Sequence, residues 1–359
     1  MSMDNIANRC GEWLRGTGPE SDIVMSSRIR LARNLADYPF IRRCNDIDKA
    51  NIESTIREQL LANPNLSSIN FINVAELNLL DRQLLVERQL ISREIANSEG
   101  ARSVAIDKLE RLSLMVNEED HMRLQVIKSG LDLGGAWDLI NDLDNEIESK
   151  LSYAYNKQLG YLTACPTNVG TGMRVSVLVH LPALVITKLI EKVFRSAQKM
   201  NLVVRGLYGE GSQAMDDFYQ VSNQVTLGKS EKDLVYLVDD VIDKVLKYER
   251  KARDFLVSEK QNDLFDKVSR AYGMLQSAQQ ISSEETMHLL SRVRMGVSLG
   301  LIEELEIPDI NQLFIRTQPA HLQKIHSSEL DSDERNIERA NYLHDQLKLD
   351  NGDSDAQMN

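Results

Sequence analysis

The sequence predicts an α+β fold, in which a mixed or antiparallel sheet flanked by helices is followed by a smaller all-helical domain. Between about residues 100 and 230, short apolar or alternating runs are separated by Gly, Pro and Asn, a pattern typical of strands. Beyond residue 230 the apolar residues recur at helical spacing instead. We therefore expect a first domain at 1–254, a helical domain at 255–345, and a polar, disordered tail at 346–359.

The individual elements follow from local patterns along the chain. Helical periodicity predicts helices at 46–61, 77–95, 131–155 and 183–200. Strands are expected at 112–116 and 122–126, on either side of an acidic turn, and then at 161–165, 175–181 and 202–207. Ser230 with Asp233, and Ser282 with Glu285, have the spacing of helix N-terminal caps, so a helix should begin after each serine.

Composition excludes several classes of protein. The 359 residues include 42 Lys and Arg against 54 Asp and Glu, a formal charge of −12, and 42% are hydrophobic. This balance disfavours a nucleic-acid-binding chain and a disordered one. No apolar run approaches the roughly 20 residues of a membrane span, and three widely spaced cysteines form neither a disulfide framework nor a zinc site. We expect a cytoplasmic protein.

Five arginines lie beside predicted strand ends or glycine loops: Arg28, Arg30, Arg123, Arg174 and Arg205. Arg28 and Arg30 are two residues apart, so they would share one face if this segment is extended. Any one of these arginines is best explained as a surface or ion-pair residue. Together they indicate a polyphosphate site, because guanidinium groups bind phosphate oxygens bidentately. The P-loop motif and the motifs of eukaryotic-type kinases are absent from the sequence.

Two acidic residues are candidates for the complementary chemistry. Glu119 in the acidic turn and Glu210 in a glycine loop could hold and deprotonate a cationic nucleophile. We expect both to stay ionised, because nearby cations lower carboxylate pKa values. His121 is expected to be structural, since no second His lies at metal-ligand spacing. Cys165 is equally well explained as a reactive thiol near the site or as an inert buried one.

Four segments carry a resemblance to a known family: 26–30 (SSRIR), 117–121 (NEEDH), 165–168 (CPTN) and 205–210 (RGLYGE). In this order they resemble the phosphagen (guanidino) kinases, and most closely the bacterial protein-arginine kinases. Further matches to the latter are at 20–24, 160–163, 209–212 and 226–231. Only 25 residues precede Ser26, whereas small-molecule phosphagen kinases carry a helical domain there. We therefore expect an open acceptor site that suits an arginine on a protein.

The resemblance implies a guanidino-kinase catalytic fold, with ATP and ATP-bound Mg²⁺, and no protein-held metal. The γ-phosphoryl group would pass in line to an arginine side chain gripped by the catalytic pair Glu119 and Glu210, with Cys165 as a thiol near the site. The residues that the resemblance implies for ATP binding are Ser26, Ser27, Arg28, Ile29, Arg30, Gln89, Arg123, Arg174, Val175, Ser176, Val177, Leu178, Arg205, Gly206, Leu207, Tyr208 and Gly209.

The chain departs from the family pattern in two places. Gln89 stands where the family usually has a nucleotide-contacting His; because Gln can still form hydrogen bonds, we expect retuned ATP binding. An allosteric phosphoarginine pocket is implied at Arg335, Asn336, Arg339 and Ala340. Asn336 replaces an Asp there, which removes a carboxylate contact to the guanidinium of phosphoarginine.

The resemblance also implies a role in stress response and protein quality control. Its implied partners are a CtsR-type repressor as substrate, an McsA-type activator, a ClpC-type unfoldase and a second copy of the chain as a homodimer. Two alternatives remain open. A free-arginine phosphagen kinase is disfavoured by the short N-terminal region, and a phosphoarginine-binding adaptor with weak catalysis is disfavoured by the intact acids and arginines.

Overall fold

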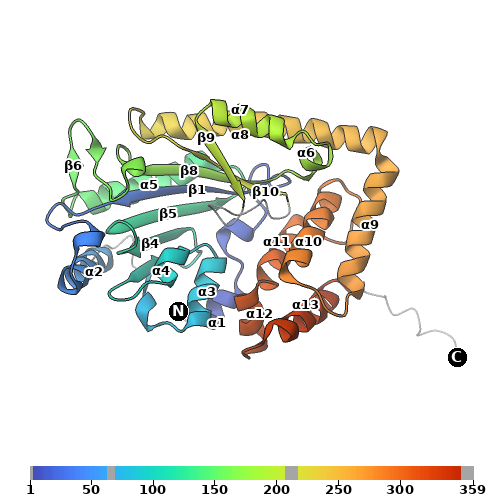
Figure 1. The fold of residues 1–359 in the computed structure, drawn as a ribbon, viewed down its shortest axis with the longest axis horizontal. Helices are drawn as coiled ribbons and strands as arrows, with labels where there is room; N and C mark the ends of the chain where they lie inside the picture. The colour runs from blue at the N-terminus through green and yellow to red at the C-terminus, as the bar shows by residue number, and fades with distance from the viewer. Residues whose placement is uncertain (1–2, 63–68, 207–216, 349–359) are drawn as a thin grey trace.

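The computed structural model describes residues 3–62, 69–206 and 217–348 and is built on one eight-stranded sheet (Figure 1). The strand order is β2-β3-β4-β5-β1-β8-β10-β9, and every neighbouring pair is antiparallel. The strands are β1 (Val24–Arg33), β2 (Asn70–Asn73), β3 (Ser103–Ile106), β4 (Leu112–Val116), β5 (Met122–Ser129), β8 (Met173–His180), β9 (Leu202–Gly206) and β10 (Phe218–Asn223), with a separate hairpin of β6 (Tyr155–Asn156) and β7 (Gly160–Tyr161). The α+β prediction is confirmed, and the sheet is antiparallel.

The two faces of the central strands differ in chemistry. In β1, Ile29 and Leu31 are buried in the apolar core, while Arg28 and Arg30 point to the opposite face because side chains alternate along a strand. The apolar face packs against α5 (Leu133–Glu148) and α8 (Glu231–Glu259). The opposite face is free of these two helices and can therefore form a polar site.

Most predicted elements are present, with corrected limits. The helices of the first part of the chain are α1 (Met3–Asn8), α2 (Asp46–Leu61), α3 (Leu79–Glu87), α4 (Arg93–Ala96), α6 (Pro182–Ile186) and α7 (Ile190–Lys199), besides α5. The helix expected at 77–95 breaks at Gln89, whose φ of 60° lies in the left-handed region. The helix expected at 183–200 breaks at Lys188, also with a φ of 60°. The helix at 131–155 ends at Glu148, and the strand at 161–165 is limited to Gly160–Tyr161. Strands β1, β2, β3 and β10 are not among the predicted ones.

A long helix connects the sheet to the C-terminal helices. α8 begins after Ser230, whose side chain accepts a hydrogen bond from the backbone of Asp233, as the sequence predicts. It runs along the sheet and then continues into α9 (Gln261–Ser277) on the right of Figure 1. The remaining helices are α10 (Ser283–Ser298), α11 (Ile307–Arg316), α12 (Pro319–His326) and α13 (Ser332–Gln346). The proposed domain boundary at 254–255 lies inside α8, and one cluster of buried apolar residues extends from β1 to α13.

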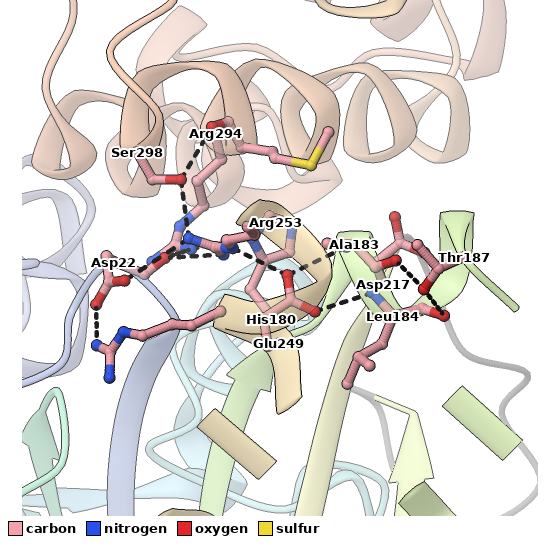
Figure 2. Close-up of polar contacts among 12 residues, drawn as sticks. Asp22, His180, Ala183, Leu184, Thr187, Asp217, Glu249, Arg253, Arg294 and Ser298 are labelled. Atoms are coloured by element: carbon pink, nitrogen blue, oxygen red, sulfur yellow. Dashed lines mark hydrogen bonds and ion pairs between the residues drawn. The ribbon is translucent and has the colours of Figure 1, made fainter. Parts of the chain in front are cut away.

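A buried polar network joins α8 and α10 to the end of β8 (Figure 2). Glu249 of α8 accepts hydrogen bonds from the backbone N–H groups of Ala183 and Leu184 at 3.1 and 3.0 Å, and its Oε1 pairs with Nε of Arg253 at 3.0 Å. In α10, Arg294 donates to the backbone oxygen of Asp22 at 3.0 Å. These contacts fix the helical region against the sheet by compensating buried charges.

None of the helices in the described parts of the chain combines the length and the apolar character that crossing a bilayer requires.

Candidate active site

The antiparallel register of four strands brings the five predicted arginines to the polar face of the sheet. Arg30 of β1 lies opposite Arg174 of β8, and Ala32 lies opposite Arg123 of β5. Arg205 of β9 lies opposite Gln220 of β10. Residues far apart in the sequence therefore meet because of strand pairing.

All five arginines line one open pocket of about 950 Å³, which we call the arginine pocket. Gln89, Gln125 and Gln220 add amide groups to its wall. A smaller recess of about 220 Å³ adjoins Arg28 and Gln89, and it is lined by Ser26, Ser176 and Leu178. A wall of guanidinium and amide groups matches the oxygen acceptors of a polyphosphate.

The electrostatics of this pocket favour an anion. Burial, together with the positive charges of Arg123 and Arg174, lowers the pKa of Arg28 to about 9. Burial and the same cluster of arginines also lower the pKa of Arg30. The buried Nε atoms of Arg28 and Arg30 have no hydrogen-bond partner in the part of the chain that the structure describes. Phosphate oxygens would satisfy these donors and relieve the repulsion between the guanidinium groups.

Gln89 lies at the break between α3 and α4 and contacts the pocket directly. Its Oε1 accepts a hydrogen bond from Arg28 at 2.8 Å, and its backbone oxygen accepts one from the Gln125 side chain at 2.7 Å. Gln89 thus orients Arg28 on the pocket wall, on the side of the recess that also contains Ser26.

A second pocket, of about 880 Å³, shares Arg30, Arg123 and Arg174 with the first. The rest of its charged wall is acidic and includes Glu94, Glu118, Glu119 and Asp120, so we call it the acidic pocket. Cys165 also lines this pocket. Two pockets of opposite character therefore meet at three arginines. This arrangement can place a phosphate group between a nucleotide on one side and a cationic acceptor on the other.

The two neighbouring glutamates of the acidic turn have opposite pKa shifts. Burial opposes ionisation of Glu118, but its close ion pair with Arg123 prevails and lowers its pKa to about 2. Burial raises the pKa of Glu119, and the negative charges of Asp120, Glu118 and Glu94 act in the same direction. The expectation that nearby cations lower the pKa of Glu119 is therefore wrong, because burial and the neighbouring negative charges outweigh the opposing effect of Arg123. A raised pKa makes Glu119 a better proton acceptor.

Hydrogen bonds fix the shape of the turn that carries Glu119. Asn117 has a φ of 59°, and its side chain donates to the backbone oxygens of Lys49 and Ala101, both at 2.9 Å. Nδ1 of His121 accepts from the backbone of Leu35 at 2.9 Å, so Nε2 carries the proton and donates to the oxygen of Pro39. His121 has the structural role that the sequence predicts.

Cys165 borders the acidic pocket, and its Sγ lies 3.0 Å from Oγ1 of Thr167. The backbone before it is held by Asp120, whose Oδ1 accepts from the backbone of Ala164 at 2.7 Å and from the Asn34 side chain at 2.6 Å. The acidic turn at 117–121 and the loop that carries Cys165 therefore form one wall of the acidic pocket.

The remaining predicted ATP-binding residues have varied positions. The side chains of Ile29, Val175 and Val177 are in the apolar core. Ser27 Oγ donates to the oxygen of Gly130 at 2.8 Å, which fixes the loop before α5, and Gly206 pairs with Tyr219 at the end of β9. Leu207, Tyr208, Gly209 and the catalytic candidate Glu210 lie outside the described residues.

Sequence reasoning missed Glu94, Gln125 and Gln220 as pocket residues. Glu94 is an isolated acid on a four-residue helix, and the two glutamines carry no motif. For Gln125 a signal exists, because it lies two residues after Arg123 in a predicted strand and must share its face.

The predicted allosteric residues gather on α13. Arg339 is buried and donates to the backbone oxygens of Thr317 and Ile281, both at 2.8 Å, and to Oδ1 of Asn336 at 2.9 Å. Ala340 is buried beside it, and Arg335 donates to the backbone oxygen of Leu330 at 2.7 Å. In this structure the Arg339 guanidinium holds three segments of the helical region together.

Comparison with known proteins supports the same chemistry. Residues 51–252 match the model of the ATP:guanido phosphotransferase C-terminal catalytic domain, and 261–357 match that of the protein-arginine kinase McsB C-terminal domain. The protein-arginine kinases of Halothermothrix orenii and Symbiobacterium thermophilum are 41% and 44% identical, over 97% and 95% of this chain and 100% and 98% of theirs. A crystal structure of lombricine kinase is similar with a TM-score of 0.58 and 26% identity, over 66% of this chain and 68% of that one. The chain belongs to the protein-arginine kinase family of ATP:guanido phosphotransferases.

Proposed function

We propose that the arginine pocket binds ATP and that the acidic pocket binds the arginine side chain of a protein substrate. The observation that supports this most strongly is the shared wall, because Arg30, Arg123 and Arg174 border both pockets. A γ-phosphoryl group at these arginines would face the acceptor nitrogen in line. Catalysis then consists of positioning and charge neutralisation.

In the proposed reaction a bond forms between phosphorus and a guanidinium nitrogen, and the bond to the ADP oxygen breaks. A guanidinium, with a pKa above ~12, is a poor nucleophile. The carboxylate of Glu119 aligns it and accepts the proton that leaves the nitrogen, while Glu210 is proposed as its second carboxylate partner. The arginines neutralise the oxygens of the transferring group.

The donors along the arginine pocket fit the phosphates of ATP, since among the described residues the buried Nε atoms of Arg28 and Arg30 have no hydrogen-bond acceptor. Mg²⁺ is proposed to arrive with these phosphates and supplies further charge neutralisation when bound.

We also propose a cellular role for this activity. Phosphorylation would mark proteins, including a CtsR-type repressor, in a cytoplasmic stress-response and quality-control system with an McsA-type activator and a ClpC-type unfoldase. The helical domain at 255–345 would support a homodimer and a phosphoarginine pocket around Arg335, Asn336, Arg339 and Ala340. The family resemblance supports these assignments.

The decisive experiment offers γ-labelled ATP with Mg²⁺ to an unfolded protein and, in parallel, to free L-arginine. Acid-labile label on protein arginine, lost in Glu119→Gln and retained in Glu99→Gln, is expected; Glu99 is an exposed acid outside the acidic pocket. Label on free arginine alone would instead favour a phosphagen kinase. Absence of transfer despite ATP binding would favour the phosphoarginine-binding adaptor.

A further inference from the structure

The C-terminal helical region contacts the end of α3 immediately before Gln89. Glu87 is 6% exposed, and its two oxygens accept hydrogen bonds from the backbone N–H groups of Ala320 and His321, at 2.8 and 3.1 Å. These N–H groups belong to the first turn of α12. A buried carboxylate at α3 is thus compensated by a helix more than 230 residues away in the sequence.

His321 makes a second connection between the same elements. Its Nδ1 lies 2.8 Å from Glu87, and its Nε2 lies 3.3 Å from a guanidinium nitrogen of Arg88. Arg88 is always a donor, so Nε2 must accept and Nδ1 must carry the proton that is donated to Glu87. Burial lowers the pKa of His321 and outweighs the opposing effect of Glu87, which is consistent with this neutral ring.

Arg88 itself has little freedom to move. It is 1% exposed and forms two hydrogen bonds with Glu110, both of 2.8 Å. The next residue is Gln89, whose left-handed backbone turns its side chain toward Arg28. Three consecutive residues therefore connect α12 to the arginine pocket.

We propose that Glu87 and His321 are positioning residues for the arginine pocket: by fixing the end of α3, the helical region sets Gln89 and, through it, the Arg28 guanidinium. This inference rests on the proposed ATP-binding role of that pocket. Neither Glu87 nor His321 touches the nucleotide in this proposal. Their loss would change the orientation of Arg28 and weaken ATP binding, while the acidic pocket keeps its geometry.

The test compares His321→Ala with His326→Ala, a histidine on the same helix whose partner is Glu338 of α13 rather than α3. In His321→Ala we expect the KM for ATP to rise about 3- to 10-fold, the usual size of an indirect coupling, with an unchanged KM for the protein substrate. His321→Asn keeps a donor for Glu87 and should recover part of the loss. His326→Ala should match the wild type.

A double-mutant cycle tests the route through Gln89. If it is correct, His321→Ala has no further effect on the KM for ATP in a Gln89→Ala background; additive effects would refute it. An unchanged KM for ATP in folded His321→Ala would refute the proposal as a whole. If the Ala variant does not fold, His321→Phe, which keeps a ring but loses the contacts to Glu87 and Arg88, gives the same decision. Arg28→Ala tests the ATP-binding role of the pocket separately from the positioning role of Glu87 and His321. If ATP binding survives Arg28→Ala, the proposed function of the pocket is wrong, whatever the result for His321.

Discussion

Replacing Glu249 of α8 is expected to destabilise the protein strongly, because its side chain is fully buried and forms three hydrogen bonds (Figure 2). Glu249→Ala would remove the buried partner of the Arg253 guanidinium, whose side chain is 5% exposed, and leave it the longer ion pair of 3.6 Å with the partly exposed Asp22. Breaking a buried ion pair in this way costs about 3–5 kcal/mol. Losing the acceptor at the start of α6 costs about 1 kcal/mol more.

We therefore expect Glu249→Ala to lower the free energy of unfolding by about 5 kcal/mol. Glu249→Gln keeps the shape and one acceptor oxygen, so it should lose about half as much. Urea unfolding followed by circular dichroism measures both, with Glu259→Ala as an exposed control on the same helix expected to stay within about 0.5 kcal/mol. A loss below about 1 kcal/mol in Glu249→Ala, at an unchanged m-value, would refute the reasoning.

Three further predictions concern function. Glu119→Gln should lower kcat about 10²- to 10⁴-fold with little change in the KM for ATP; a normal rate in the labelled-ATP assay would contradict its role as base. The wild-type rate should fall as the pH drops through the raised pKa of Glu119, because the base becomes protonated, and Glu94→Gln should move this fall to lower pH by removing a negative neighbour. In Asn336→Asp the new carboxylate can pair with Arg339 and with an incoming guanidinium, so calorimetry should show tighter binding of free phosphoarginine than in the wild type; equal binding would exclude this effect.

Much of the fold could be predicted because the spacing of apolar residues along a helix or strand follows the side that is buried. Helix 46–61 has the predicted limits, and the strands around the acidic turn were visible from alternation. Strand β1 was missed because polar and apolar residues alternate in it only from Arg28 to Leu31, whereas the preceding segment 24–27 has two apolar residues followed by two serines. The helix break at Gln89 could not be predicted, because no Gly or Pro marks it in the sequence.

The arginines that line the arginine pocket could be predicted from the sequence, but Gln125 and Gln220 on its wall and the electrostatics of the site could not. The arginines carry recognisable motifs, and the structure brings all five to one pocket. The predicted sign of the pKa shift of Glu119 was wrong, since the shift depends on how deeply Glu119 is buried and on negative neighbours that include Glu94 from a separate helix. Such distances are set by tertiary packing, which local sequence patterns do not record.

The length of α8 restricts the insertions that this chain can accept. Its 29 residues form one continuous helix that starts on the sheet and ends at α9. Inserting one residue after Arg253 would turn everything beyond it by about 100° and displace it by about 1.5 Å, so that the apolar residues of α9 would no longer face their partners. Seven residues would nearly restore the direction but shift the C-terminal helices by about 10 Å. Related chains should therefore vary in length in their loops, and α8 should keep its residue count.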